Sequence, residues 1–172
     1  MSRQQILERL LAERAVYKLE SLLTGDETVR TMIVAPALFA DVMPPFADTP
    51  QGERLGELRA WFDAFMEGAE ITVCENPDRK PPDTMLARVH PVKEEFWSVR
   101  VTDPADTPGI RSLGAFSNCD EFIALRWEYR EHIEIFDDEV TATIEAWRDL
   151  FRSEKPHDGS NIDEYLSCNR PV

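Results

Sequence analysis

The fold is decided by residues 110–130, which read Ile110-Arg111-Ser112-Leu113-Gly114-Ala115-Phe116-Ser117-Asn118-Cys119-Asp120-Glu121-Phe122-Ile123-Ala124-Leu125-Arg126-Trp127-Glu128-Tyr129-Arg130. Two runs rich in β-branched and aromatic residues flank a polar turn, which is the pattern of a β-hairpin. Strand alternation predicts that the second strand has one buried face and one mixed face. The buried face consists of Ile123, Leu125, Trp127 and Tyr129. The mixed face consists of Phe122, Ala124, Arg126, Glu128 and Arg130.

Three more strand-like segments precede this hairpin, at residues 71–73, 85–89 and 96–101. Proline-containing loops separate them, and the links are short. Successive strands with short links favour antiparallel pairing between neighbours in the sequence. We therefore predict an α+β fold with an antiparallel five-stranded meander over about residues 69–130.

Helical patterns precede and follow the predicted sheet. Ser2 and Gln5 form a capping-box signature at the start of a helix that we expect to end at Gly25. Residues 26–34 then favour a second short helix. A proline that follows a threonine predicts the first turn of the firmest helix, over residues 50–67.

Two further segments complete the expected organisation of the chain. Pro36 predicts the first turn of another short helical piece, and apolar residues at helical spacing predict a C-terminal helix that packs on the sheet. A length of 172 residues fits one domain. We expect this single domain, residues 1–172, to have four parts: a helical part (1–67), the sheet (68–130), a helix (137–153) and a tail (157–172).

The overall charge and the cysteines limit the environment and the partners of the protein. A formal net charge of −14 repels nucleic-acid backbones and acidic membrane surfaces, so we expect neither as a partner. Three widely spaced cysteines, without a CxxC pair, favour neither a disulfide framework nor a zinc site. The N-terminus lacks the apolar core of a secretory signal, and we predict a cytoplasmic protein with no cofactor and no metal.

Four arginines on the predicted strands are the candidate binding residues. Arg100 is in phase with Phe96 and Ser98, and Arg111 is in phase with Leu113 and Ala115. If these faces coincide with the mixed face of the hairpin, a basic stripe forms that can bind a phosphate or carboxylate through guanidinium groups. Alternatively, the arginines neutralise nearby glutamates across the sheet. The stripe consists of Arg100, Arg111, Arg126 and Arg130, and the glutamates are Glu128, Glu131 and Glu134.

The remaining chemically active residues give no catalytic assignment. The only histidines, His90, His132 and His157, are far from one another and from every cysteine in the sequence, so we interpret them as structural residues. No GxGxxG, P-loop, GxSxG or HExxH pattern occurs. The sequence therefore predicts no catalytic residue.

The segment from Gly109 to Phe116 and the segment from Phe122 to Arg130 together resemble the sheet of the RelE/HigB-type toxin superfamily, over about a third of the chain. The resemblance implies a ribonuclease or an inactive relative, in which Arg111, Arg126 and Arg130 match the RNA-facing basic positions. This chain departs from the family because glutamates interleave with its arginines and its pI is about 4.6. Residues 85–166 also resemble proteins carried on bacterial mobile elements.

Three functional hypotheses follow from the sequence. The first is a non-enzymatic protein-interaction or regulatory domain, whose partner is another protein and whose oligomeric state the sequence leaves open. The second is the RelE/HigB-like ribonuclease or its inactive relative. The third is a small-anion-binding domain that uses the arginine stripe.

Overall fold

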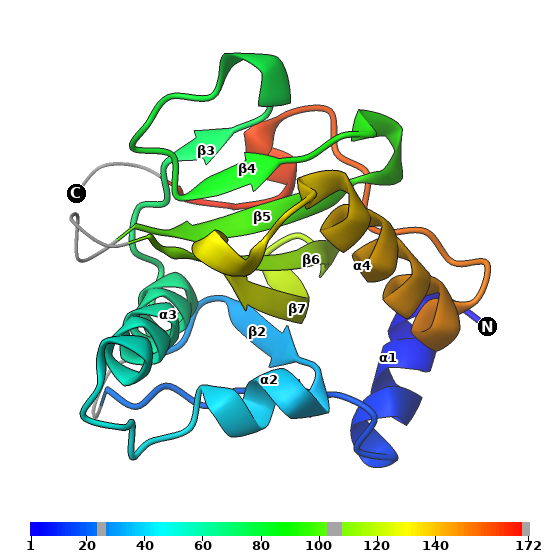
Figure 1. Ribbon diagram of the computed structural model, residues 1–172. Coiled ribbons are helices and arrows are strands. Elements are labelled where there is room, and N and C mark those ends of the chain that lie inside the picture. The colour runs from blue at the N-terminus through cyan, green and yellow to red at the C-terminus, as the bar shows by residue number, and fades with distance from the viewer. Residues whose placement is uncertain (24–26, 103–107, 170–172) are drawn as a thin grey trace.

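The computed structural model describes residues 1–23, 27–102 and 108–169, and these form a mixed sheet with helices on both faces (Figure 1). The order of strands across the seven-stranded sheet is β1-β2-β7-β6-β5-β4-β3. The strands are β1 (Tyr17–Lys18), β2 (Thr31–Val34), β3 (Val73–Cys74), β4 (Leu86–Arg88), β5 (Phe96–Val101), β6 (Ile110–Asn118) and β7 (Glu121–Tyr129). The α+β class is therefore confirmed.

The predicted five-stranded antiparallel meander is wrong in two respects. The pairs β4–β5, β5–β6 and β6–β7 are antiparallel, as expected. Strand β3, however, pairs with β4 in parallel. Strand β2 also pairs in parallel, with β7, and β1 extends the sheet beyond β2. The sheet is thus mixed because a strand from the N-terminal part of the chain lies against the hairpin.

The N-terminal part contains less helix than the sequence pattern predicts. Helix α1 (Arg3–Ala12) has the expected capping box but ends long before Gly25, which lies outside the described residues. Instead of a second helix, the described residues 27–34 contain strand β2. Met32, Ile33 and Val34 are all buried, since the sheet is covered on both faces, and an apolar run of this kind suits a fully buried strand.

The other helices agree with the prediction within a few residues. They are α2 (Pro36–Asp41), α3 (Pro50–Met66) and α4 (Phe136–Phe151). The chain also has four short 3-10 helices, η1 (Pro77–Arg79), η2 (Val92–Glu94), η3 (Arg130–His132) and η4 (Ile162–Glu164), in the described ranges. The Thr49 hydroxyl accepts a hydrogen bond from the Gly52 amide at 3.1 Å and caps α3.

Two apolar cores lie on opposite faces of the sheet. Helix α3 packs on one face with Trp61, Phe62 and Phe65. Helices α1 and α4 pack on the other face, where Trp147 and Phe96 meet edge to face at 6.0 Å. Figure 1 shows α3 on one side of the sheet and α4 with α1 on the other. Every central strand therefore has to present apolar side chains in both directions.

A β-bulge in β7 overturns the predicted faces of the hairpin. Leu113 pairs with Arg126 but Gly114 pairs with Ala124, so one extra residue, Leu125, interrupts the alternation. Gly114 permits this close approach, because an added Cβ would lie 2.0 Å from the Ile123 carbonyl oxygen. Ile123 and Leu125 therefore face α1 and α4, whereas Trp127 and Tyr129 pack on the α3 side with Phe122 and Ala124.

The tail after α4 is anchored in the core on the α3 side. Tyr165 is fully buried, and its hydroxyl group donates to Glu95 at 2.5 Å and accepts from the Gly159 amide at 2.8 Å. The Asp120 amide donates to the Tyr165 carbonyl oxygen at 2.8 Å, which ties the tail to the β6–β7 turn. Residues 157–169 are thus an integral part of the fold.

Candidate anion-binding site

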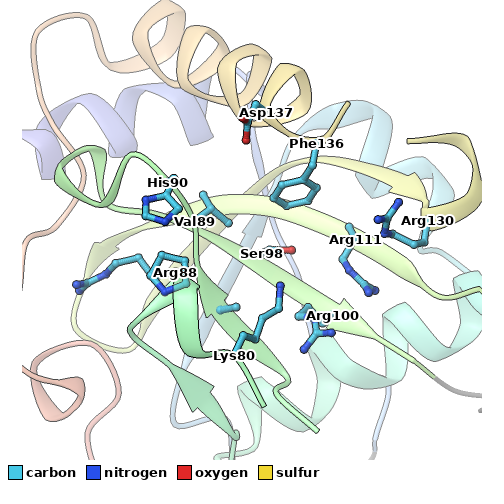
Figure 2. A pocket seen from close by; sticks show the side chains of 12 residues that line it. Lys80, Arg88, Val89, His90, Ser98, Arg100, Arg111, Arg130, Phe136 and Asp137 are labelled. Atoms are coloured by element: carbon cyan, nitrogen blue, oxygen red, sulfur yellow. The ribbon is translucent and has the colours of Figure 1, made fainter. Parts of the chain in front are cut away.

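A cavity of about 330 Å³ lies over the sheet beside the start of α4. Strands β4, β5 and β6, the loop after η1, the 3-10 helix η3 and the first turn of α4 all contribute to it. Its lining residues are Pro77, Lys80, Ala87, Arg88, Val89, His90, Ser98, Arg100, Arg111, Arg130, Phe136 and Asp137. Figure 2 shows this cavity, which we call the cationic pocket.

Four cationic side chains meet in the cationic pocket. Arg100 on β5 and Arg111 on β6 are direct partners in the register of the sheet, and like charges in such a pair repel each other. Arg130 opens η3, immediately after β7, and Lys80 follows η1. Figure 2 shows Lys80, Arg100 and Arg111 extending toward the same region, with Arg130 beside Arg111.

Burial and repulsion by neighbouring arginines lower the pKa values of Arg111 and Lys80. Burial first, and then the positive charges of Arg100 and Arg130, lower the pKa of Arg111 to about 10. Burial and the same kind of repulsion, from Arg100, Arg111 and Arg130, lower the pKa of Lys80. Arg111 still carries its charge at neutral pH, because its pKa remains well above 7. Bringing these positive charges together in a partly buried pocket therefore costs free energy.

Two of the three glutamates named in the sequence analysis, Glu128 and Glu131, contact residues other than the candidate arginines. Glu131 pairs with Arg54 at 2.7 Å. Glu128 accepts from its neighbouring amide at 2.8 Å and contacts His132 at 3.3 Å. Within residues 1–23, 27–102 and 108–169, no carboxylate forms an ion pair with Arg100, Arg111 or Arg130.

Arg126 is the one candidate residue that the structure places elsewhere. It shares a sheet face with Arg111 because of the bulge, but its guanidinium group pairs with Glu139 of α4 at 3.1 Å. Both side chains are partly exposed, and Arg126 does not line the cationic pocket. This arginine is therefore neutralised, but by a carboxylate of α4 and not by the glutamates considered in the sequence analysis.

Arg54 holds the wall that carries Arg130. From α3 it donates to the Pro108 carbonyl oxygen at 2.8 Å and to both carboxylate oxygens of Glu131, and its guanidinium carbon lies 4.2 Å from the ring centroid of Tyr129. These contacts join α3, the segment before β6 and η3. Arg130, next to Glu131 in η3, is thereby held at the edge of the pocket.

Two buried polar atoms in the pocket wall have no hydrogen-bond partner in the described part of the chain. They are the Ser98 hydroxyl oxygen and the Arg100 Nε. Buried polar groups are normally hydrogen-bonded, so both atoms are unsatisfied in this part of the fold. Arg88 differs, since it extends away from the cavity in Figure 2 and pairs with Glu95 at 3.4 Å.

Several pocket residues were not predicted as site residues from the sequence. Lys80 lies in a loop rich in proline and charge, and no periodic pattern places such a loop over a strand. Ser98 carried a usable signal, because it alternates in phase with Arg100 on β5. His90, interpreted as structural, lies at the rim, where its Nε2 is 2.9 Å from an Asp78 carboxylate oxygen.

No helix in the described ranges is long and apolar enough to cross a lipid bilayer. Comparisons with protein-family models, with curated proteins and with solved structures find no match to this chain. The function is therefore inferred from the residues of the cationic pocket alone.

Proposed function

We propose that this protein binds a small anion with at least two negative charges in the cationic pocket. The supporting observation is the convergence of Lys80, Arg100, Arg111 and Arg130 without a carboxylate partner among the described residues. An anion between these groups would offset their mutual repulsion, and guanidinium groups bind phosphate and carboxylate oxygens in pairs. Ser98 also lines this pocket, and its buried hydroxyl oxygen has no partner among the described residues.

The size of the pocket also supports a small ligand. A cavity of about 330 Å³ lies at the lower end of the usual range for small-molecule sites. The net charge of −14 opposes long polyanions, since their attraction depends on many phosphate contacts over an extended surface. A compact anion experiences mainly the local field of the four cations.

The experiment is thermal unfolding with inorganic phosphate, sulfate and a dicarboxylate, at constant ionic strength. A ligand that binds the native state raises the melting temperature by mass action. We expect a shift for the wild type, and a loss of most of it in Arg111→Met, which retains the aliphatic stem. Arg126→Met is the matched control, since this arginine lies on the same sheet face outside the pocket. An equal shift in both variants would remove the pocket as the binding site.

The two other hypotheses stay predictions. A protein-interaction role rests on the acidic composition and the absence of motifs in the sequence. For the ribonuclease hypothesis, Arg111 and Arg130 share the pocket while Arg126 pairs with Glu139. Growth arrest on expression in bacteria, abolished by Arg111→Ala, would support the nuclease over the small-anion binder.

A further inference from the structure

The cationic pocket has two chemically different ends. Lys80, Arg100, Arg111 and Arg130 form one end. The other end is formed by the side chains of Ala87, Val89, His90, Phe136 and Asp137. Figure 2 shows Asp137 and His90 apart from Arg100, Arg111 and Arg130, with Ser98 between the two groups and the Phe136 ring extending toward it. A ligand that fills the whole pocket must therefore carry an anionic group at one end and a different chemical group at the other.

The pocket is also larger than a free inorganic anion requires. Its volume of about 330 Å³ reaches the range in which small organic ligands bind. Phosphate or sulfate alone would occupy only the cationic end and leave the apolar side chains of Ala87, Val89 and Phe136 in contact with solvent. The dimensions thus favour an ester or another organic derivative of the anion.

Phe136 provides a flat apolar surface beside the cations. It is the first residue of α4, packs partly on the core formed by α1 and α4, and is half-buried. In Figure 2 its ring extends from the helix toward Ser98. An aromatic ring in this position can stack on a flat ring of a ligand, which is an interaction typical of nucleobase binding.

Asp137 places a carboxylate at the end of the pocket that lies away from Arg100, Arg111 and Arg130. This side chain is exposed and forms no ion pair or side-chain hydrogen bond with another described residue. A carboxylate can only accept hydrogen bonds when ionised, and it repels an anion. Its presence beside a cationic pocket selects a ligand whose far end donates a hydrogen bond.

We propose, on the basis of the anion site above, that the ligand is a nucleoside monophosphate in free solution. Its phosphate lies among Lys80, Arg100, Arg111 and Arg130, its base stacks on Phe136, and a base N–H group donates to Asp137. This ligand class satisfies both ends of the pocket with one phosphate and one flat ring.

The test is titration calorimetry at constant ionic strength with four probes. These are inorganic phosphate, ribose 5-phosphate, the set of AMP, GMP, CMP and UMP, and a short single-stranded RNA with a 5′-phosphate. We expect the tightest nucleoside monophosphate to bind at least about tenfold more tightly than ribose 5-phosphate, since stacking on an aromatic residue is worth that much. The RNA should bind more weakly than the free nucleotide, because the acidic protein repels a longer polyanion.

Two variants separate the base contact from the phosphate contact. Phe136→Leu keeps an apolar side chain on the core, and it should bring the affinity for the nucleotide to within about threefold of that for ribose 5-phosphate. Asp137→Asn should weaken the nucleotide and slightly strengthen ribose 5-phosphate, since it removes both an acceptor and a repulsive charge. Arg111→Met should weaken every phosphate-containing probe.

The outcomes distinguish this inference from the function on which it rests. Equal affinities for nucleotides and ribose 5-phosphate in the wild type, or an unchanged ratio in Phe136→Leu, would overturn the nucleotide and leave the anion site. Tighter binding of the RNA would overturn the free nucleotide as the ligand. If no phosphate-containing probe binds, the nucleotide is wrong, and the anion site is wrong as well if sulfate and the dicarboxylate also give no thermal shift.

Discussion

Two groups of arginines in this protein differ in what surrounds their charge. The paired arginines are Arg54, Arg59 and Arg88, and the nitrogen–oxygen distances to their carboxylate partners are 2.7, 3.1 and 3.4 Å, respectively. The converging arginines, Arg100, Arg111 and Arg130, share the cationic pocket with Lys80 and have no such partner in the ranges that the structure describes. The paired arginines join segments of the fold, while the converging arginines leave their charge available to a ligand.

The two groups differ in whether a nearby negative charge offsets the cost of burying the guanidinium group. A buried cation loses hydration, and a nearby anion with well-aligned hydrogen bonds offsets that loss. Arg59 has such a set, since it bonds to Asp63, to the Glu20 carbonyl oxygen and to the Val42 carbonyl oxygen. In the cationic pocket, Arg100, Arg111 and Arg130 donate to the backbone carbonyl oxygens of Thr84, Ile110 and Ile133, respectively. No carboxylate among the described residues pairs with them, so an anionic ligand would add charge compensation.

The largest expected effect comes from breaking a paired arginine. In Arg59→Met, Asp63 is left buried without its cation, and we expect a loss of about 3–5 kcal/mol in the free energy of unfolding. Urea denaturation measures it. The exposed pair of Arg126 is the control, and Arg126→Met should cost less than about 1 kcal/mol. A loss of similar size in the two variants would contradict the distinction between buried and exposed pairs.

A smaller loss in the free energy of unfolding is expected when the tyrosine that hydrogen-bonds to a paired arginine loses its hydroxyl group. The Tyr165 hydroxyl accepts from Arg88 at 2.9 Å and donates to Glu95 at 2.5 Å, so Tyr165→Phe leaves the Arg88–Glu95 pair with fewer hydrogen bonds. We expect a loss of about 1–3 kcal/mol, measured by urea denaturation. Tyr17→Phe, in a half-buried stacked ring, is the matched hydroxyl deletion and should be close to neutral. No loss in Tyr165→Phe would mean that the Tyr165 hydroxyl group does not contribute to anchoring the tail.

The converging arginines should respond in the opposite direction. Without added anion and at low ionic strength, Arg111→Met should raise the free energy of unfolding by about 0.5–1 kcal/mol, because it removes the repulsion across the Arg100–Arg111 pair. Denaturation with and without phosphate measures both effects, and the stabilisation by phosphate should be lost in the same variant. A destabilised Arg111→Met protein would show that this arginine serves the fold, like the paired group.

The smallest expected effect is on the pH dependence of anion binding. The pKa of Arg111 in the free protein is about 10, below its usual value, and that of Lys80 is also lowered. Sulfate keeps its charge throughout, so its affinity should be constant from about pH 7 to about pH 9 and then fall as the pH rises through the lowered pKa values. Thermal shift at matched ionic strength measures this. In Arg111→Met the decline should be shallower, because only Lys80 and Arg100 then retain lowered pKa values in the pocket. A decline already complete by about pH 8 would point to another group.

The sequence predicted the hairpin well and its side-chain directions less well. The bounds of β7 agree with the pattern, and α3 begins at the expected cap. The bulge at Leu125 was not predicted, because a single extra residue leaves the apolar content of the strand unchanged while it reverses the faces beyond it. Gly114 was the available signal, since a glycine inside a strand pattern often marks a bulge.

The N-terminal strands were missed for a different reason. Residues 27–34 were assigned to a helix, and only pairing with β7 makes Thr31–Val34 a strand. That pairing joins residues about 90 positions apart, as in Ile33 with Ile123, and no local pattern contains it. The candidate site shows the same limit, because Lys80 and Phe136 reach the pocket from a loop and from the start of a helix.

The sequence by itself determined the α+β class, the central antiparallel strands and the in-phase arginines on β5 and β6, because periodicity and alternation are local properties of the chain. Only the tertiary structure decided the mixed topology, the pairing of Arg126 with Glu139 and the meeting of Arg100, Arg111 and Arg130 with Lys80. These depend on which distant segments share a face of the sheet. Whether a charged side chain is neutralised or left available to a ligand is set by neighbours that are remote in the sequence.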